Sequence, residues 1–354
     1  MWEACLSELT SAPWAARLAA RAFGRGLLGT IDGGGAALFL LRKPILAVSN
    51  NAVVRAALSK TPLTRSVVDR FTAGETATDA LAAVADLHAH GLQVSLDHLG
   101  EDTRDRAAAD ATVDAYLDLL QVLAAAGQVA GSELSVKLSA VGQALPAAED
   151  VPGGGHAYAL AGVRRIAEAA YAAGARVTLD MEDHTTVDST LEVLAVLRKD
   201  HPDVGVAIQA MLLRTPKDLL ELTGPGSRVR LVKGAYDEPD SVAFTDPAQI
   251  DLAYVRALKV LMRGKGHPMV GSHDPRIVAI AAKLADDAGR TPNRWEHQML
   301  YGIRPEEQTR LVAEGRTVRV YIPYGTDWYG YFARRLAERP ANLLFFARSV
   351  VSRD

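Results

Sequence analysis

Eight short runs of apolar and β-branched residues recur along this chain from residue 93 onward. Each run ends in polar or charged residues, and an alanine-rich stretch with helical periodicity follows it. Successive runs lie about 32 residues apart on average, which matches the length of a strand with its returning helix. The pattern therefore predicts a closed (β/α)₈ barrel of the TIM type, with strands at residues 93–97, 134–138, 176–180, 204–209, 228–233, 269–273, 295–299 and 318–322.

The segments between these runs have the features of helices. Residues 113–126 and 158–173 carry apolar residues three to four positions apart and stop at Gly127 and Gly174. Glycine commonly adopts the left-handed conformation that closes a helix, so both glycines are predicted to be C-terminal caps.

The first quarter of the chain is predicted to be helical as well. An alanine-rich helix is expected at residues 76–90, and further helices are expected within residues 50–71. The predicted organisation is an N-terminal helical segment, residues 1–64, followed by the barrel domain, residues 65–354. Residues 1–35 contain a glycine run that we interpret as a flexible hinge.

Charge and cysteine content restrict the function classes. The 39 basic and 42 acidic residues are mixed along the sequence, so no basic stripe is available for a nucleic acid. The single cysteine, Cys5, excludes an internal disulfide and suits a reducing compartment, so a cytoplasmic location is expected. The apolar stretch at residues 36–48 is interrupted by Arg42 and Lys43 and is too short to span a membrane.

Polar side chains gather where the predicted strands end. In a (β/α)₈ barrel these positions face the mouth, where active sites form. Exposure to solvent would explain any one of them, but their recurrence favours a functional site. The residues concerned are Lys137, Asp180, Glu182, Asp183, Gln209, Arg230, Lys233, His273 and Gln298.

Two adjacent arginines, Arg334 and Arg335, follow the last predicted strand on an aromatic-rich segment. A guanidinium group is a planar fork that suits a carboxylate, so the pair could clamp a small acid over the mouth. The alternative is an exposed helix face on which Glu338 forms ion pairs with these arginines.

Several motifs in order give the chain a resemblance to the proline dehydrogenase family, from about Arg65 to the C-terminus. They are residues 70–75 (RFTAGE), 95–101 (SLDHLGE), 135–139 (SVKLS), 180–182 (DME), 230–236 (RLVKGAY), 298–302 (QMLYG) and the segment with the paired arginines. The resemblance implies a distorted (β/α)₈ barrel whose last helix lies over the mouth. It also implies FAD-dependent oxidation of L-proline to 1-pyrroline-5-carboxylate by hydride transfer to the flavin, the first step of proline catabolism to glutamate.

The resemblance also implies partners. Electrons would pass to a quinone, so transient contact with a membrane surface is expected, and a pyrroline-carboxylate dehydrogenase would act downstream. The segment at residues 38–48 is a candidate for the membrane contact, although packing of an N-terminal helix on the barrel is the preferred interpretation.

Residue roles are carried over from the family by position. Asp180 matches its active-site carboxylate beside Lys137, and Arg230 would lie near the reactive flavin nitrogen. Tyrosine at position 321 favours proline over hydroxyproline, and Ser272 keeps the hydroxyl of the threonine common there. The implied proline ligands are Lys137, Arg334 and Arg335 for the carboxylate, and Leu300, Tyr321 and Tyr331 for the ring. The implied flavin contacts are Met181, Gln209, Arg230, Lys233, Gly234, Ala235, Ser272, His273 and Glu338.

These residue types suit the reaction. Cations fix the carboxylate while apolar groups enclose the ring, and orientation is then the main catalytic contribution. Arg230 would favour the negative charge that develops on the reduced flavin. For Asp180, orientation of Lys137 by an ion pair is at least as well supported as a proton-transfer role.

Three other sequence features have alternative interpretations. Residues 24–29 satisfy the GxGxxG string but follow a predicted helix where a dinucleotide site needs a strand. His88 and His90 lie before the first strand, where a surface role is expected and not a metal site. The acidic run at residues 180–183 with His184 could hold a divalent metal, but this leaves the paired arginines unexplained.

Two rival functions remain as well. Lys137 or Lys233 could form a Schiff base with a carbonyl substrate, or the barrel could be a non-catalytic binding protein.

Overall fold

The computed structural model describes residue 68, residues 70–329 and residue 331. Its centre is a closed barrel of eight parallel strands in sequential order, in which β1 also pairs with β8. The eight predicted strands are confirmed, with ends shifted by no more than two residues. Their bounds are β1 Gln93–His98, β2 Ser132–Val136, β3 Arg176–Leu179, β4 Gly205–Gln209, β5 Arg228–Val232, β6 His267–Gly271, β7 Glu296–Leu300 and β8 Val318–Tyr324.

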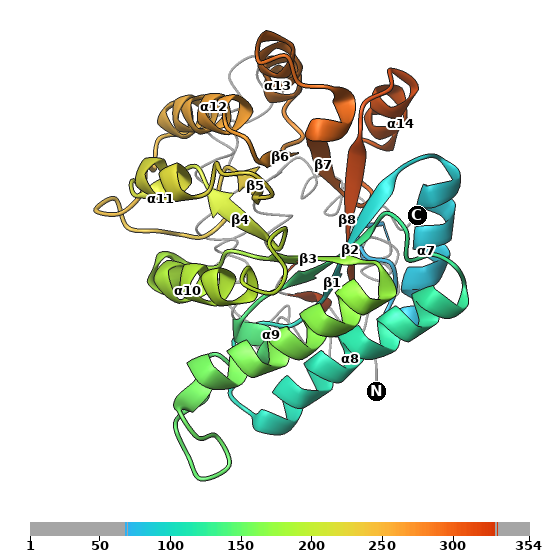
Figure 1. Ribbon diagram of the computed structural model, residues 1–354, viewed down its shortest axis with the longest axis vertical. Coiled ribbons are helices and arrows are strands. Elements are labelled where there is room, and N and C mark those ends of the chain that lie inside the picture. The colour runs from blue at the N-terminus through green and yellow to red at the C-terminus, as the bar shows by residue number, and fades with distance from the viewer. Residues whose placement is uncertain (1–67, 69, 330, 332–354) are drawn as a thin grey trace, which may run out of the picture.

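Helices surround the barrel, and one follows each of the first seven strands (Figure 1). The helix before β1 is α7, Ala77–Ala89, whose N-terminus is closed by reciprocal hydrogen bonds between Thr76 and Asp79. The others are α8 Arg106–Ala125, α9 Gly154–Ala173, α10 Val187–Leu197, α11 Thr215–Glu221, α12 Pro247–Arg263, α13 Pro275–Asp287 and α14 Pro305–Ala313. Short 3₁₀ helices occupy Ser139–Val141, His184–Thr186 and Pro292–Arg294.

The predicted glycine caps close their helices. Gly174 is the C-cap of α9 with φ of 90°, and Gly127 follows the C-cap of α8, Ala126, with φ of 67°. Both angles fall in the left-handed region, which a side chain with a β-carbon disfavours. The chain therefore turns back toward the next strand at these two points, as the sequence predicts.

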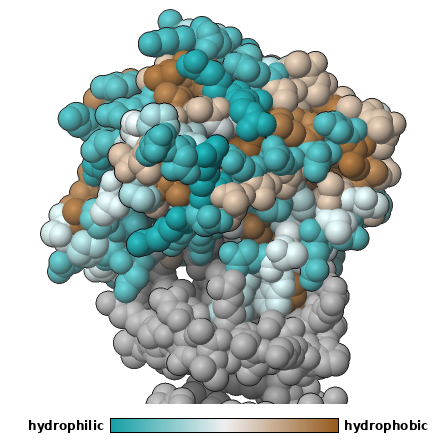
Figure 2. Space-filling model, turned by 90° about the horizontal axis from the view of Figure 1, so that it is seen from below, coloured by the Kyte–Doolittle hydropathy of each residue, from teal (hydrophilic) through white to brown (hydrophobic). Residues whose placement is uncertain are grey.

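The helix predicted at residues 76–90 is confirmed as α7. The helices predicted within residues 50–71, the hinge at residues 33–35, the segments 24–29 and 36–48, and the C-terminal helix lie wholly or mostly outside the described residues. In the part of the chain that is described, no helix is both long and apolar enough to cross a membrane. One face of the molecule shows hydrophobic residues interspersed among hydrophilic ones (Figure 2). The largest apolar side chains exposed among the described residues are Leu213, Leu220, Leu252 and Val260.

The apolar core lies between the strands and the helices. Leu96, Leu134 and Leu179 on the strands and Tyr116 and Ile166 on the helices are fully buried there. Strand side chains alternate between the two faces of the sheet, so the neighbours of these leucines point into the barrel.

The barrel interior is charged. Bulky branched residues usually fill this space, but here Arg228, Arg230 and Arg319 share it with Glu133 and Glu296, each at most 4% exposed. Glu133 accepts from Arg228 and Arg230, and Glu296 accepts from Arg319. Charges removed from water are tolerated when they are paired and hydrogen-bonded, and this interior meets that condition.

We expect the free energy of unfolding to fall when the pH is lowered from about 5 to about 3. Burial alone would raise the pKa of Glu133, but Arg319, Arg228 and Arg230 lower it to about 2. An unfolded glutamate titrates near 4.3. The stabilisation is therefore complete above that pH and is lost as the pH falls through about 2, at about 1.4 kcal/mol per unit of pKa difference.

Denaturant unfolding across this pH range measures the effect. Asp200→Asn, which changes an exposed carboxylate, should leave the slope unchanged, whereas Glu133→Gln should make it shallower. A free energy that stays level between about pH 5 and pH 3 would contradict the prediction.

Candidate active site

Two carboxylates and a lysine meet at the C-terminal end of the barrel. Lys137, just after β2, places its Nζ 2.6 Å from Oδ1 of Asp97 on β1 and 3.9 Å from Oδ2 of Asp180 after β3. Lys137 is 8% exposed and Asp97 is 1% exposed, so little water screens the pair. Asp97 is thus the nearer partner of Lys137.

Asp180 is the centre of a hydrogen-bonded group. Its Oδ1 accepts from Nη1 of Arg230 at 2.6 Å and from the Ser135 hydroxyl at 2.7 Å. Its Oδ2 accepts from the Tyr321 hydroxyl at 2.7 Å. One carboxylate therefore connects strands β2, β5 and β8.

The guanidinium of Arg230 lies inside the barrel beneath this group, and every one of its N–H groups has an acceptor. Nε donates to Gln298, Nη1 donates to Ser135 and Asp180, and Nη2 donates to Ser95 and Glu133. It also lies over the ring of Tyr321, 5.3 Å from the centroid. Arg230 is thereby fixed in one orientation.

Burial and neighbouring charges shift the titration of this group. Burial raises the pKa of Asp97, and the nearby ammonium of Lys137 opposes that shift. Burial also raises the pKa of Tyr321 well above its ordinary value, so the phenol is a hydrogen-bond donor at neutral pH. For Arg230, burial would lower the pKa, but the carboxylates of Asp180 and Glu133 outweigh it and the pKa is raised.

Apolar and aromatic side chains lie beside the polar group. Tyr331 is 7% exposed and belongs to a cluster with Val68, Phe71 and Leu99, against which Tyr321 packs. The structure thus brings the two tyrosines of the predicted ring pocket together. Leu300, at the end of β7, donates its backbone N–H to Nε2 of His273 at 2.8 Å.

The predicted flavin contacts form a second group after strands β3 to β6. Lys233 lies between the carboxylates of Asp251 and Asp274. Gly234 has φ of 111°, and a β-carbon there would lie 2.4 Å from the Met211 sulfur, so both the backbone conformation and the space favour glycine. The remaining members are Met181, Gln209, Ala235, Ser272 and His273; Met181, Gln209 and Ser272 are buried, and Ala235 and His273 are partly exposed.

Arg334, Arg335 and Glu338 lie outside the described residues. Direct contacts join four of the predicted site residues that the structure describes: Lys137, Asp180, Arg230 and Tyr321.

Two residues of this group, Asp97 and Glu133, are not among the site residues that the sequence predicts. Asp97 ends the first predicted strand and stands in the 95–101 motif, so the rule applied to the later strand ends would have found it. Glu133 gives a weaker signal, namely a charged residue at the start of a run that is otherwise buried.

The acidic run at residues 180–183 does not converge on one point. Glu182 accepts from the backbone N–H and hydroxyl of Ser139, Asp183 accepts from Thr185, and His184 contacts Glu238. No group of three or more potential metal ligands occurs among the described residues.

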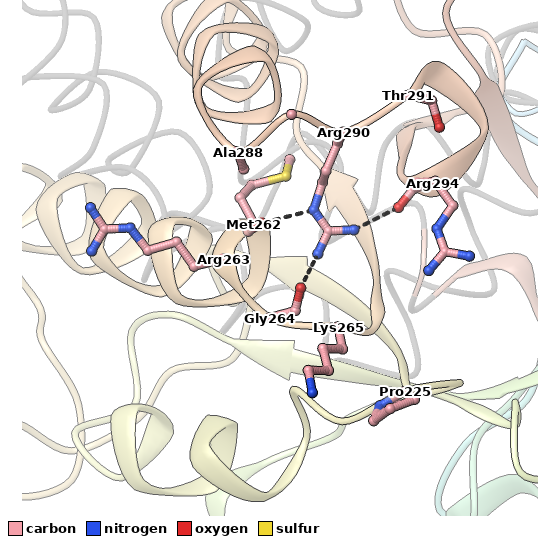
Figure 3. A pocket seen from close by; sticks show the side chains of 10 residues that line it. Pro225, Met262, Arg263, Gly264, Lys265, Ala288, Arg290, Thr291 and Arg294 are labelled. Carbon is pink, nitrogen blue, oxygen red and sulfur yellow. Dashed lines mark hydrogen bonds between the residues drawn. The ribbon is translucent and has the colours of Figure 1, made fainter.

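A pocket of about 590 Å³ lies at the opposite end of the barrel, ahead of strands β5 to β7. Arg290 lies at its centre and donates to the backbone carbonyls of Met262, Gly264 and Arg294 at 2.7–2.9 Å (Figure 3). The bonds to Met262 and Gly264 satisfy carbonyls left open at the end of α12, and the bond to Arg294 ties in the 3₁₀ helix before β7. Arg290 therefore has a structural role. The pocket lies at the N-terminal end of the barrel, which usually serves stability in this fold.

Comparison with known proteins agrees with the motifs. The family model described as proline dehydrogenase matches residues 80–348. Proline dehydrogenase 1 of Bacillus subtilis is 35% identical over 314 residues, which cover 89% of this chain and 100% of that protein. Proline dehydrogenase of Deinococcus radiodurans is 37% identical over 314 residues, which cover 88% of this chain and 98% of that protein.

This chain belongs to the proline dehydrogenase family. It is therefore an oxidoreductase of that family, and the resemblance seen in the sequence motifs is confirmed.

A solved structure agrees with the barrel fold. Proline utilization A from Bdellovibrio bacteriovorus, inactivated by N-propargylglycine, superposes with a TM-score of 0.71 at 24% identity. The match covers 89% of this chain and 38% of that longer chain, so this chain spans well under half of its length. At this identity the likeness concerns the fold, and the (β/α)₈ barrel is common to both.

Proposed function

We propose that this proline dehydrogenase family member oxidises L-proline to 1-pyrroline-5-carboxylate with FAD as its cofactor and a quinone as its electron acceptor. The observation that carries the proposal is the convergence of Lys137, Asp180, Arg230 and Tyr321 at the C-terminal end of the barrel. This arrangement offers a cation for a carboxylate, an aromatic surface for a ring and a buried positive charge beneath them.

Lys137 binds one end of the substrate. Its ammonium faces the carboxylate of L-proline, and Asp97 holds it in place at 2.6 Å. Arg334 and Arg335 complete the carboxylate clamp in this proposal. Two or more cations around one carboxylate fix its orientation as well as its position, which is the entropic part of catalysis.

Tyr321, Tyr331 and Leu300 enclose the pyrrolidine ring. The Tyr321 hydroxyl is committed to Asp180, so its ring presents a fixed apolar surface to the substrate. The resemblance assigns position 321 to the choice between proline and hydroxyproline, and the same hydrogen bond leaves no donor for an extra substrate hydroxyl.

The residues after strands β3 to β6 fit a flavin. Gly234 has a φ of 111° and no side chain, so the loop after β5 can hold this backbone conformation against Met211. Lys233 adds an ammonium group for a phosphate. Met181, Gln209, Ala235, Ser272, His273 and Glu338 complete the proposed contacts.

Bound FAD supplies the two-electron acceptor that side chains lack. Arg230 contributes a fixed positive charge, which is worth most where charge develops in a site shielded from water. Asp180 accepts hydrogen bonds from Arg230, Tyr321 and Ser135 and keeps these side chains in fixed relative positions. Its primary role is therefore orientation.

The partners follow from the chemistry. A quinone acceptor is membrane-bound, so transient contact with a membrane surface belongs to the proposal, and a pyrroline-carboxylate dehydrogenase would consume the product. A cytoplasmic location, peripheral at the membrane, is consistent with this scheme.

The visible spectrum of the purified protein tests the proposal directly. A flavin spectrum that bleaches on anaerobic addition of L-proline is the expected result. A flavin spectrum that proline leaves oxidised would overturn the substrate assignment, and a protein that binds no flavin would overturn the cofactor assignment. Borohydride trapping of a carbonyl compound on Lys233 would instead favour Schiff-base chemistry.

Gly234→Ala should lower the flavin content of the purified protein by about tenfold or more, because the new β-carbon would meet Met211 and force the loop to move. The flavin-to-protein absorbance ratio measures this. Gly127→Ala is the matched control, since Gly127 also has positive φ but has open space around it. Equal flavin content in both variants would remove Gly234 from the proposed cofactor site.

A further inference from the structure

Glu133 is the most buried acidic side chain beneath the candidate active site, with 0% exposure. It lies on β2, and its carboxylate sits among the arginines that fill the barrel interior. The reaction proposed above assigns it no part, and the interior of such a barrel is more often filled by branched apolar side chains.

The two carboxylate oxygens of Glu133 have different partners. Oε2 accepts from Nη2 of Arg228 at 2.6 Å. Oε1 accepts from Nη2 of Arg230 at 2.8 Å and from the Ser95 hydroxyl at 3.0 Å. One oxygen thus faces the N-terminal end of the barrel and the other faces the candidate active site.

Ser95 extends the effect of Glu133. Because the Ser95 hydroxyl gives its proton to Glu133, its lone pairs are left for Nη2 of Arg230, which donates to it at 3.0 Å. Glu133 therefore determines both acceptors of Nη2, one directly and one through a neighbour.

The opposite side of the same guanidinium faces the site. Nη1 of Arg230 donates to Asp180, which in turn accepts from Tyr321. Arg230 is planar and rigid, so fixing Nη2 also fixes the direction in which Nη1 points.

We propose that Glu133 is a positioning residue that holds the guanidinium of Arg230, and through it the carboxylate of Asp180, in place beneath the substrate. The inference rests on the proposed function for the roles of Arg230 and Asp180. The contacts by which Glu133 orients Arg230 lie in the barrel interior and do not depend on that function. The low pKa of Glu133, about 2, keeps it charged throughout the physiological range.

Arg228 provides a matched control. It shares the ion pair with Glu133 but contacts the other oxygen, and its remaining hydrogen bond goes to the Met269 sulfur. If the charged interior served stability alone, substitutions of Glu133 and Arg228 would have equal effects on turnover. If Glu133 positions Arg230, only the substitution of Glu133 lowers turnover.

The experiment compares Glu133→Gln, Arg228→Leu and the double variant Glu133→Leu with Arg228→Leu. Glu133→Gln leaves buried arginines without their counter-charge and can fail to fold. The double variant removes one buried cation together with the anion, so the net charge of the interior is unchanged and Arg230 keeps Asp180 as its counter-charge. It is therefore the variant expected to fold.

With L-proline and a saturating acceptor, we expect the double variant to lose about tenfold or more in kcat. Its KM for proline should change by less than about threefold, because Asp97 holds the carboxylate ligand Lys137 independently. Arg228→Leu should keep both constants within about twofold of the parent. A crystal structure of the double variant should show Nη2 of Arg230 turned away from its parental position beside Ser95, with the guanidinium tilted relative to the parent.

The inference is overturned if the double variant folds with parental kcat, or if the guanidinium of Arg230 keeps its parental orientation in its crystal structure. It is also overturned if Arg228→Leu loses as much kcat as the double variant. Failure of the proposed function has a different signature: the parent protein then shows no bleaching with proline, and the position of Arg230 in the two crystal structures decides the inference alone.

Discussion

Replacing Asp180 with alanine is expected to lower the turnover of L-proline by about a hundredfold or more. The substitution removes the acceptor of three donors at once: Arg230, Ser135 and Tyr321. Each buried donor left without a partner costs about 1–3 kcal/mol, and the three would reorient to recover that loss. Steady-state kinetics at saturating proline measures the effect.

Asp203→Ala is a matched control for this variant. Asp203 also accepts from an arginine and a tyrosine, Arg176 and Tyr171, but it lies at the opposite end of the barrel. It should lower stability without lowering turnover. Parental turnover of Asp180→Ala at saturating proline would show that Asp180 has no part in the reaction.

Replacing Asp97 with asparagine is expected to raise the KM for L-proline by about tenfold, with a smaller change in kcat. Asp97 is the nearest partner of Lys137, at 2.6 Å, whereas Asp180 is 3.9 Å away. Without the charge of Asp97, the ammonium would shift toward Asp180 and away from the substrate carboxylate. The loss would then fall on binding and not on the chemical step.

Kinetics over a range of proline concentrations separates these two effects, and Asp200→Asn, on the exposed surface, provides the control. A fall in kcat with an unchanged KM would argue instead that Asp97 acts on the reacting centre. An unchanged KM together with an unchanged kcat would contradict the assignment of Lys137 as a ligand held by Asp97.

The two aspartates of the candidate site differ in the groups that they contact. Among the described residues, Asp97 pairs with one side chain of opposite charge, Lys137, at 2.6 Å. Asp180 by contrast accepts from three groups on three strands. We therefore expect Asp97 variants to alter substrate binding and Asp180 variants to alter the geometry of the whole site.

The sequence by itself determined the barrel. Strand and helix periodicity are local properties, so residues 176–180 indicate a strand and residues 158–173 indicate a helix without knowledge of their neighbours. The regular spacing of eight such units leaves few topologies besides a closed barrel. Ordered motifs such as 135–139 and 230–236 likewise predicted the family.

The domain boundary near residue 64, the clamp of Arg334 and Arg335, and the contact of Glu338 stay predictions, because they fall partly or wholly outside the described residues.

Only the tertiary structure decided which side chains meet. Lys137 and Asp97 are 40 residues apart in the chain, Arg230 and Glu133 are 97 apart, and Tyr321 and Asp180 are 141 apart. Strand periodicity says that each of them faces the barrel interior, but closure and register set the distances between them. That is why the sequence named Asp180 as the carboxylate beside Lys137, while the folded barrel places Asp97 closer and puts Glu133 beneath Arg230.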